Sequence, residues 1–126
     1  MAITYLTFEQ VCKINQDLFP FKVGMNYKGG MEFILSYVQE LYDELNEKSA
    51  IIAKCAYLWH SIASTQHFTN GSKRTGYLVA DDFLRLNNLK INASEDEKFS
   101  ISMGIANHIL TIDHVRQWVT KALKPD

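Results

Sequence analysis

Apolar residues recur at helical spacing through most of the chain and predict a succession of helices. The first predicted helix runs from Phe8 to about Leu18. It follows a capping-box pattern formed by Thr7 and Gln10, and it stops before Pro20, which restricts the residue that precedes it. The second predicted helix runs from Met31 to about Asn46, with acidic residues along its polar face.

The third predicted helix, over residues 50–65 with Ser49 as its cap, is apolar on nearly every side. A helix with this pattern is buried all round, so we expect it to be the central helix of the domain. The fourth predicted helix begins near Ser72 and ends at the pair Asn87-Asn88, a frequent C-terminal signal. In this helix, Asp81 is expected in water or paired with Arg85.

The last part of the chain predicts a short extended piece at residues 89–92 and two more helices. The fifth helix opens with the capping box of Ser94 and Glu97 and runs to about Ile109, and the sixth starts at Thr111 or Asp113. The tail Pro125-Asp126 is expected to fray. The predicted fold class is all-α, a compact bundle of about six helices around a buried central helix, in a single domain covering residues 1–126.

The stretch Phe19–Gly29 is the least regular part of the chain, because Gly, Pro and Asn interrupt its large apolar residues. Two interpretations remain open for it. It forms a short β flap, or it is a loop whose aromatic side chains plug the core.

Composition and charge narrow the possible partners. A net charge of −1 gives no electrostatic case for a nucleic-acid or membrane partner. No apolar run approaches the length of a membrane span, and the first residues lack the pattern of a signal peptide, so we expect a cytoplasmic protein. Cys12 and Cys55 fall at apolar helical positions without metal-binding spacing, and are expected to be buried free thiols.

The stretch from Gln66 to Thr75 contains the candidate ligand-binding residues. Asn70-Gly71 is a strong turn signal, Ser72 is a candidate N-cap, and Lys73 and Arg74 then fall in the first helical turn. Cations at a helix N-terminus are disfavoured by the helix dipole, and a bound anion such as phosphate would compensate them. The alternative is an ordinary loop whose two cations point into water.

This stretch resembles the signature of the Fic/Doc family, His-x-Phe-x-(Asp/Glu)-(Gly/Ala)-Asn-(Gly/Lys)-Arg. Four positions match it, Phe68, Gly71, Lys73 and Arg74, and Thr75 matches the Thr that follows the Arg in one branch of the family. The Lys-Arg-Thr ending is similar to that of the Doc (death-on-curing) toxin branch. Longer Fic motifs carry a second Arg three positions after the first, where this chain has Tyr77, again as in Doc.

Three positions depart from the signature. Gln66 stands at the position of the catalytic His, Asn70 at that of a metal-binding acid, and Ser72 at that of an Asn that contacts phosphate. Gln66 cannot act as a general base, because an amide does not titrate near neutral pH. His67 is a possible substitute base if a bulge turns it inward. Asn70 would be a weak metal ligand, since its carbonyl lacks the charge that favours Mg²⁺.

The resemblance implies that an active protein would use ATP, with Mg²⁺ to neutralise the phosphate charge. Family members transfer AMP or, in Doc, the γ-phosphate of ATP to a protein hydroxyl. Gly71, Ser72, Lys73 and Arg74 are the implied phosphate-binding residues, and the flap residues Lys22 and Val23 would bind the target segment by strand addition.

Three functions follow from these observations. The first is a Doc-like toxin fold with a partly retained phosphate-binding loop, weak or inactive in transferring phosphate or AMP because Gln66 replaces the base. The second is an active Doc-type protein kinase toxin of a toxin–antitoxin system, acting on the translation machinery. The third is a protein-interaction module without a nucleotide site. Whether the chain is an enzyme therefore stays open at this point.

The resemblance also implies partners. Doc-type toxins are neutralised by a small antitoxin whose disordered C-terminal segment folds into a groove on the toxin. We expect this groove on the exposed faces of the first helix and the Phe19–Gly29 flap. The implied target of an active protein is elongation factor Tu.

Overall fold

The computed structural model describes residues 2–18, 28–65 and 71–126. In these residues the chain forms six helices and one two-stranded antiparallel sheet, in the order α1 (Phe8–Leu18), α2 (Lys28–Tyr37), α3 (Glu47–Ala63), α4 (Ser72–Leu86), β1 (Leu89–Ile91), α5 (Glu95–Ala106), α6 (Ile112–Ala122) and β2 (Leu123–Pro125). The prediction of a mostly helical bundle is confirmed. Residues 19–27 of the predicted flap at Phe19–Gly29 lie outside the described residues. Its last two residues, Lys28 and Gly29, belong to α2.

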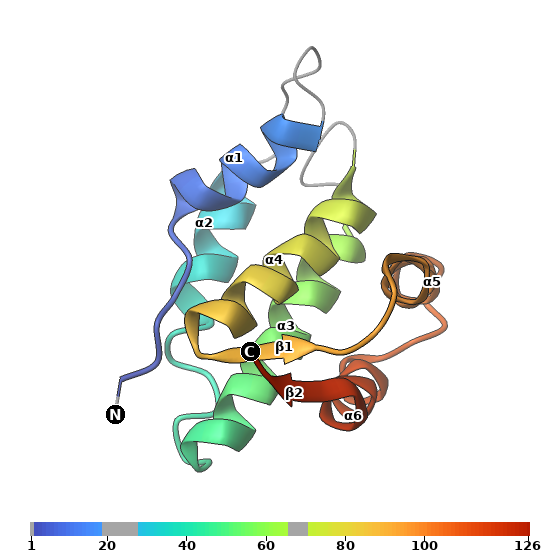
Figure 1. The fold of residues 1–126 in the computed structure, drawn as a ribbon. Helices are drawn as coiled ribbons and strands as arrows, with labels where there is room; N and C mark the ends of the chain where they lie inside the picture. The colour runs from blue at the N-terminus through green and yellow to red at the C-terminus, as the bar shows by residue number, and fades with distance from the viewer. Residues whose placement is uncertain (1, 19–27, 66–70) are drawn as a thin grey trace.

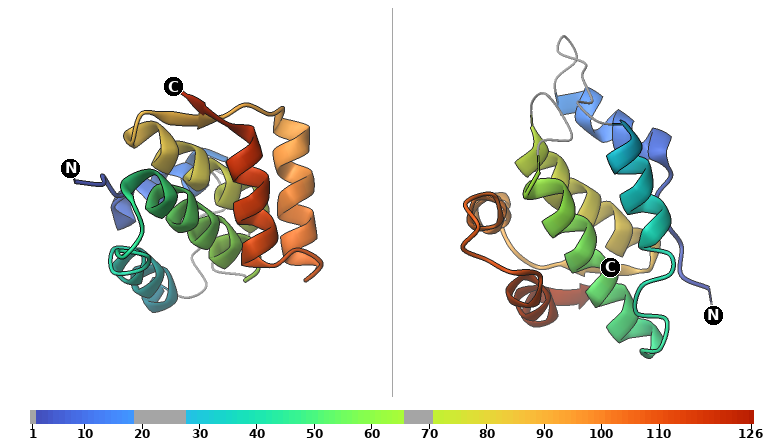
Figure 2. Two further views of the ribbon diagram at one scale, coloured as in Figure 1. Left: turned by 90° about the horizontal axis from the view of Figure 1, so that it is seen from below. Right: turned by 180° about the vertical axis from the view of Figure 1, so that it is seen from behind.

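Helices α3 and α4 form the centre of the molecule (Figure 1). Helices α1 and α2 cover them on one side, and α5 and α6 cover them on the other (Figure 2). The two central helices approach closely at Gly76, where an added Cβ would lie 3.2 Å from the Cβ of Ala63. As predicted, α3 is the most buried helix, because its apolar residues contact neighbours on every side.

Helix α3 nevertheless contains a fully buried cation, Lys54, which the apolar pattern around it concealed. Its ammonium donates hydrogen bonds to the backbone carbonyls of Val38 and Gln39 at 3.0 and 3.2 Å, and to the Tyr5 hydroxyl at 2.8 Å. It also pairs with the exposed Asp43 carboxylate at 3.1 Å. A buried ammonium must have such partners, and Lys54 satisfies carbonyls that follow the end of α2.

The predicted second helix to Asn46 was therefore too long. Helix α2 ends at Tyr37, and the chain then continues in turns in which Tyr42 adopts a positive φ of 63°. The predicted cap Ser49 was also wrong, since Asn46 caps α3 by accepting a hydrogen bond from the Ser49 N–H at 2.9 Å. Asn46 is thus the start of α3 instead of the end of α2.

The end of the chain is ordered into the sheet, contrary to the predicted fraying. Pro125 in β2 lies opposite Leu89 in β1, and the Asp126 N–H donates to the Asn88 carbonyl at 3.1 Å. The extended piece predicted near residue 89 is confirmed as β1. Its partner strand was not predicted, because three residues carry too little pattern to indicate a strand.

The capping box predicted at Ser94 starts α5, and a capping box that was not predicted starts α6 at Thr111, one of the two predicted starts. The Ser94 side chain accepts from the Glu97 N–H at 3.1 Å, and the Thr111 side chain accepts from the His114 N–H at 3.2 Å. Helix α5 ends at Ala106, three residues before the predicted end. Among the described residues, no helix is both long enough and apolar enough to cross a membrane.

Candidate functional site at the N-terminus of α4

The first turn of α4 has backbone N–H groups without a partner in the helix, and its sequence carries two cations, Lys73 and Arg74. Gly71 is the N-cap residue, with a φ of 79° and a ψ of 19° in the left-handed region that favours glycine. It provides no side-chain cap, and the first helical hydrogen bond runs from the Thr75 N–H to the Gly71 carbonyl at 2.7 Å. The N–H groups before Thr75 therefore have no partner within the helix, as at every helix start.

Ser72 is the first residue of α4 and not its N-cap, which corrects the prediction. Its Oγ is buried and has no hydrogen-bond partner among the described residues. A buried hydroxyl without a partner costs free energy, so a ligand or a neighbouring group that supplies one would be stabilised here. The predicted role of Ser72 in a phosphate cradle stays a prediction.

Two neighbouring helices hold the first turn of α4. From α1, the Asn15 side-chain amide donates to the Thr75 hydroxyl at 3.1 Å, and both residues are buried. From α5, the Ser102 hydroxyl donates to the Lys73 carbonyl at 2.8 Å. Ser102 in turn accepts from the Trp59 indole N–H at 2.8 Å, so a hydrogen-bonded chain joins α3, α5 and α4.

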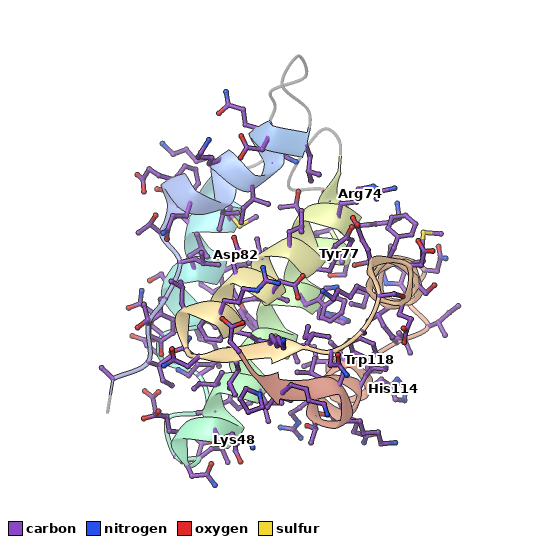
Figure 3. All side chains as sticks on the ribbon, viewed as in Figure 1. Lys48, Arg74, Tyr77, Asp82, His114 and Trp118 are labelled. Atoms are coloured by element: carbon purple, nitrogen blue, oxygen red, sulfur yellow. The ribbon has the colours of Figure 1, made fainter. Side chains whose placement is uncertain are left out.

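Arg74 lies in the same turn, with an exposed side chain on the side of α4 that faces α5 (Figure 3). The carbon of its guanidinium is 4.7 Å from the centre of the Phe99 ring. Next to it, the Tyr77 hydroxyl donates to the Glu95 carboxylate at 2.6 Å. Burial raises the pKa of Tyr77 and the bond to Glu95 raises it further, while the nearby Arg74 lowers it.

One turn further along, α4 carries a largely buried ion pair with α5. Asp81 was expected in water or beside Arg85, but it pairs with Lys98 at 2.9 Å, with exposed side-chain fractions of 9% and 12%. Burial raises the pKa of Asp81, and the Lys98 ammonium opposes that rise. Together with Tyr77 and Glu95, this pair fixes α5 against α4.

The structure brings four predicted site residues together, Gly71, Ser72, Lys73 and Arg74. Gln66, His67, Asn70 and the flap residues Lys22 and Val23 lie outside the described residues, so their predicted roles stay predictions. In the described part of the chain, no group of three or more His, Cys, Asp or Glu side chains could hold a metal ion.

The sequence interpretation missed Asn15, Phe99 and Ser102. The spacing of Asn15 and Ser102 was a usable signal. Asn15 lies four residues after the buried Val11, and Ser102 lies three residues before the buried Ile105, so each falls on the buried stripe of its helix. A polar residue on the buried stripe of a helix must find a partner inside the protein. The identity of that partner could not be read from spacing.

Residues 5–84 match the sequence profile described as the Fic/DOC family. This match spans more than half of the chain and includes α1 to α3 and all but the last residues of α4. The chain belongs to the Fic/DOC family. A comparison with curated proteins finds no match. The family match contains the α4 N-terminus, whereas α5, which contributes Phe99 and Ser102, follows it in the chain.

Proposed function

We propose that this chain is a Doc-branch member of the Fic/DOC family that binds the phosphate groups of ATP at the N-terminus of α4. We further propose that it transfers phosphate or AMP weakly or not at all. The observation that carries the proposal is the buried Ser72 Oγ, which has no hydrogen-bond partner in the described part of the chain and lies beside the left-handed Gly71 and the cations Lys73 and Arg74. N–H groups without a partner in the helix, a hydroxyl and the cations of one helical turn are the kinds of donor that phosphate oxygens accept from.

The Doc assignment rests on two sequence features. Lys73-Arg74-Thr75 matches the Doc ending, and Tyr77 occupies the position of the second Arg of longer Fic motifs. In the structure, the Tyr77 hydroxyl is bonded to Glu95 at the edge of α5. Arg74 is then the one arginine in the first turn of α4 whose guanidinium can bind the phosphates.

Weak transfer follows from Gln66. In the family, a histidine at this position takes the proton from the attacking hydroxyl, and loss of a general base lowers a rate by typically about 10²–10⁴-fold. Asn70 in place of the metal-binding acid weakens Mg²⁺ binding further, because a neutral carbonyl replaces a carboxylate. Phosphate binding is retained because its donors come from Gly71 to Arg74.

Calorimetry with ATP and Mg²⁺ tests the binding. We expect micromolar to submillimolar affinity, weakened at least about tenfold by Arg74→Ala, because a charged hydrogen bond is lost. Arg85→Ala is the matched control, since Arg85 is an exposed arginine in the last turn of the same helix. Equal affinity of both variants, or no binding by the unsubstituted chain, would overturn the phosphate site.

A double substitution, Gln66→His with Asn70→Asp, tests the proposed cause of weak transfer. We expect it to transfer label to elongation factor Tu, while the unsubstituted chain transfers little. Comparing ATP labelled at the γ-phosphate with ATP labelled at the α-phosphate identifies the transferred group. Strong transfer by the unsubstituted chain would instead establish the active kinase, with His67 as the first candidate for its base.

The family resemblance also suggests a partner surface. A groove with a volume of about 440 Å³ lies between α1 and α4, and it combines apolar and charged residues: Leu6, Gln10, Lys13, Ile14, Asp17, Asp82, Arg85 and Leu86. We propose it as the docking site for the disordered segment of a small antitoxin. Leu86→Asp should then abolish co-purification of the antitoxin, and Leu45→Asp should not, although the two leucines are 39% and 38% exposed.

A further inference from the structure

Helix α5 lies outside the segment that matches the family, yet it contacts the phosphate-binding turn of α4 at two points. The Phe99 ring lies 4.7 Å from the Arg74 guanidinium carbon, and the Ser102 hydroxyl is bonded to the Lys73 carbonyl at 2.8 Å. We propose that Phe99 is a positioning residue for phosphate binding. Its ring holds the guanidinium of Arg74 beside the N-terminus of α4. This inference rests on the proposed function.

The Phe99 ring would lower the entropy cost of ordering the Arg74 side chain when an anion binds. This side chain is exposed and has many rotamers, so binding an anion would cost the entropy of ordering it. A guanidinium that already lies against an aromatic face has lost part of that freedom before the anion arrives. A guanidinium has five N–H donors, so those that do not face the ring or the Tyr77 hydroxyl remain for the anion.

The ring is itself held in place. Phe99 is half-buried between residues of α5 that are tied to α4: Glu95 to Tyr77 at 2.6 Å, Lys98 to Asp81 at 2.9 Å, and Ser102 to Lys73 at 2.8 Å. These ties lie before and after Phe99 along the same helix. A platform fixed on both sides can position a flexible side chain.

A carboxylate does not compete with the anion for Arg74. Glu95 is the acidic residue beside it, but its carboxylate accepts from the Tyr77 hydroxyl, and no ion pair joins Arg74 to Glu95 among the described residues. Arg74 thus lies against the neutral Phe99 ring and beside the neutral Tyr77 hydroxyl, and both leave its charge for the ligand.

The experiment compares ATP·Mg²⁺ affinity by calorimetry in Phe99→Leu and Phe99→Tyr. Leucine keeps an apolar side chain but removes the aromatic face, whereas tyrosine restores it. We expect Phe99→Leu to weaken binding about three- to fivefold, as for loss of an exposed cation–π contact, and Phe99→Tyr to bind as the unsubstituted chain does. Phe33→Leu on α2 is the control for the same chemical change at an exposed site.

A second experiment, in the Arg74→Lys variant, tests whether Phe99 affects ATP binding through Arg74. In Arg74→Lys, which lacks the planar group, Phe99→Leu should change the affinity less than about twofold. The Nε–H resonance of Arg74 in the ligand-free protein should also shift in Phe99→Leu and not in Phe33→Leu, because the ring current is removed.

The outcomes separate this inference from the proposed function. If Arg74→Ala weakens binding but Phe99→Leu does not, Phe99 has no positioning role and the phosphate site stands. If Phe99→Tyr fails to restore the affinity, or if Phe33→Leu weakens it equally, the aromatic ring is not the cause. If the unsubstituted chain binds no ATP, both the site and the role of Phe99 are overturned.

Discussion

The Ser102 hydroxyl in α5 donates a 2.8 Å hydrogen bond to the backbone carbonyl of Lys73 in the first turn of α4. The same hydroxyl accepts the indole N–H of Trp59 from α3. One fully buried side chain thus connects three helices at the end of α4 where the phosphate site is proposed. Its removal should affect both stability and binding.

Ser102→Ala should lower the free energy of unfolding by about 1–3 kcal/mol, because the buried indole N–H of Trp59 loses its acceptor. Chemical denaturation measures this loss, and ATP·Mg²⁺ affinity should fall with it as the first turn of α4 loses its tie. Ser100→Ala, at an exposed position of the same helix, is the control and should change stability by less than about 0.5 kcal/mol. Similar behaviour of the two variants would argue against the connection.

Lys54→Met should destabilise the protein by about 3 kcal/mol, because two backbone carbonyls and the Tyr5 hydroxyl lose a buried donor. Lys48→Met, an exposed lysine in the same helix, is the matched control (Figure 3). Asp43→Asn should cost little, since that carboxylate is 68% exposed. A cost for Asp43→Asn equal to that for Lys54→Met would assign the effect to the ion pair instead.

The two thiols should differ in reactivity. Burial strongly raises the pKa of Cys55, and the nearby Asp81 carboxylate raises it further, so the thiolate is scarce and enclosed. Burial also raises the pKa of Cys12, but this thiol is only partly buried. Mass spectrometry after alkylation at mildly alkaline pH should show one modified cysteine, Cys12, in the folded protein and two after denaturation. Equal labelling of both in the folded state would contradict this.

Stability should decrease as the pH falls below about 6.5, in part because of His60. Burial lowers the pKa of His60, although a hydrogen bond with the Leu110 backbone opposes the shift. The folded state therefore favours the neutral ring, and this contribution is complete above the ordinary pKa and is lost as pH falls through it towards the lowered value. His60→Gln should show a shallower decline of the melting temperature between pH 7 and pH 5. The difference should be small, because the ring is only half-buried and water screens its charge. Identical slopes would remove His60 from the explanation.

Local signals in the sequence predicted much of the helical framework. The capping boxes predicted at Thr7 and Ser94 each start a helix in the structure, and the apolar pattern of residues 50–65 identified the buried helix α3. These features depend on residues close together in the chain, which is why they can be read without the fold. The motif residues Gly71 to Arg74 could likewise be identified without the fold, because they are adjacent in the chain.

Where local patterns were ambiguous, residues distant in the chain decided the secondary structure. Helix α2 ends early where Lys54 of another helix binds the carbonyls of Val38 and Gln39, and residues of the tail become a strand because β1 lies beside them. A one-dimensional pattern shows that a segment is apolar or polar. It does not show which distant group will satisfy its backbone.

The sequence by itself determined the family of this chain, its helical class and the cations at the start of α4, since each depends on residue identity and near spacing. Only the tertiary structure decided that Ser72 has a buried hydroxyl, that Phe99 lies against Arg74 and that Ser102 supports Lys73. The last two relationships depend on how α5 packs against α4, and both helices also contact α3. The physical reason is that contacts between helices arise from the shape and pairing of whole surfaces, which no local spacing contains.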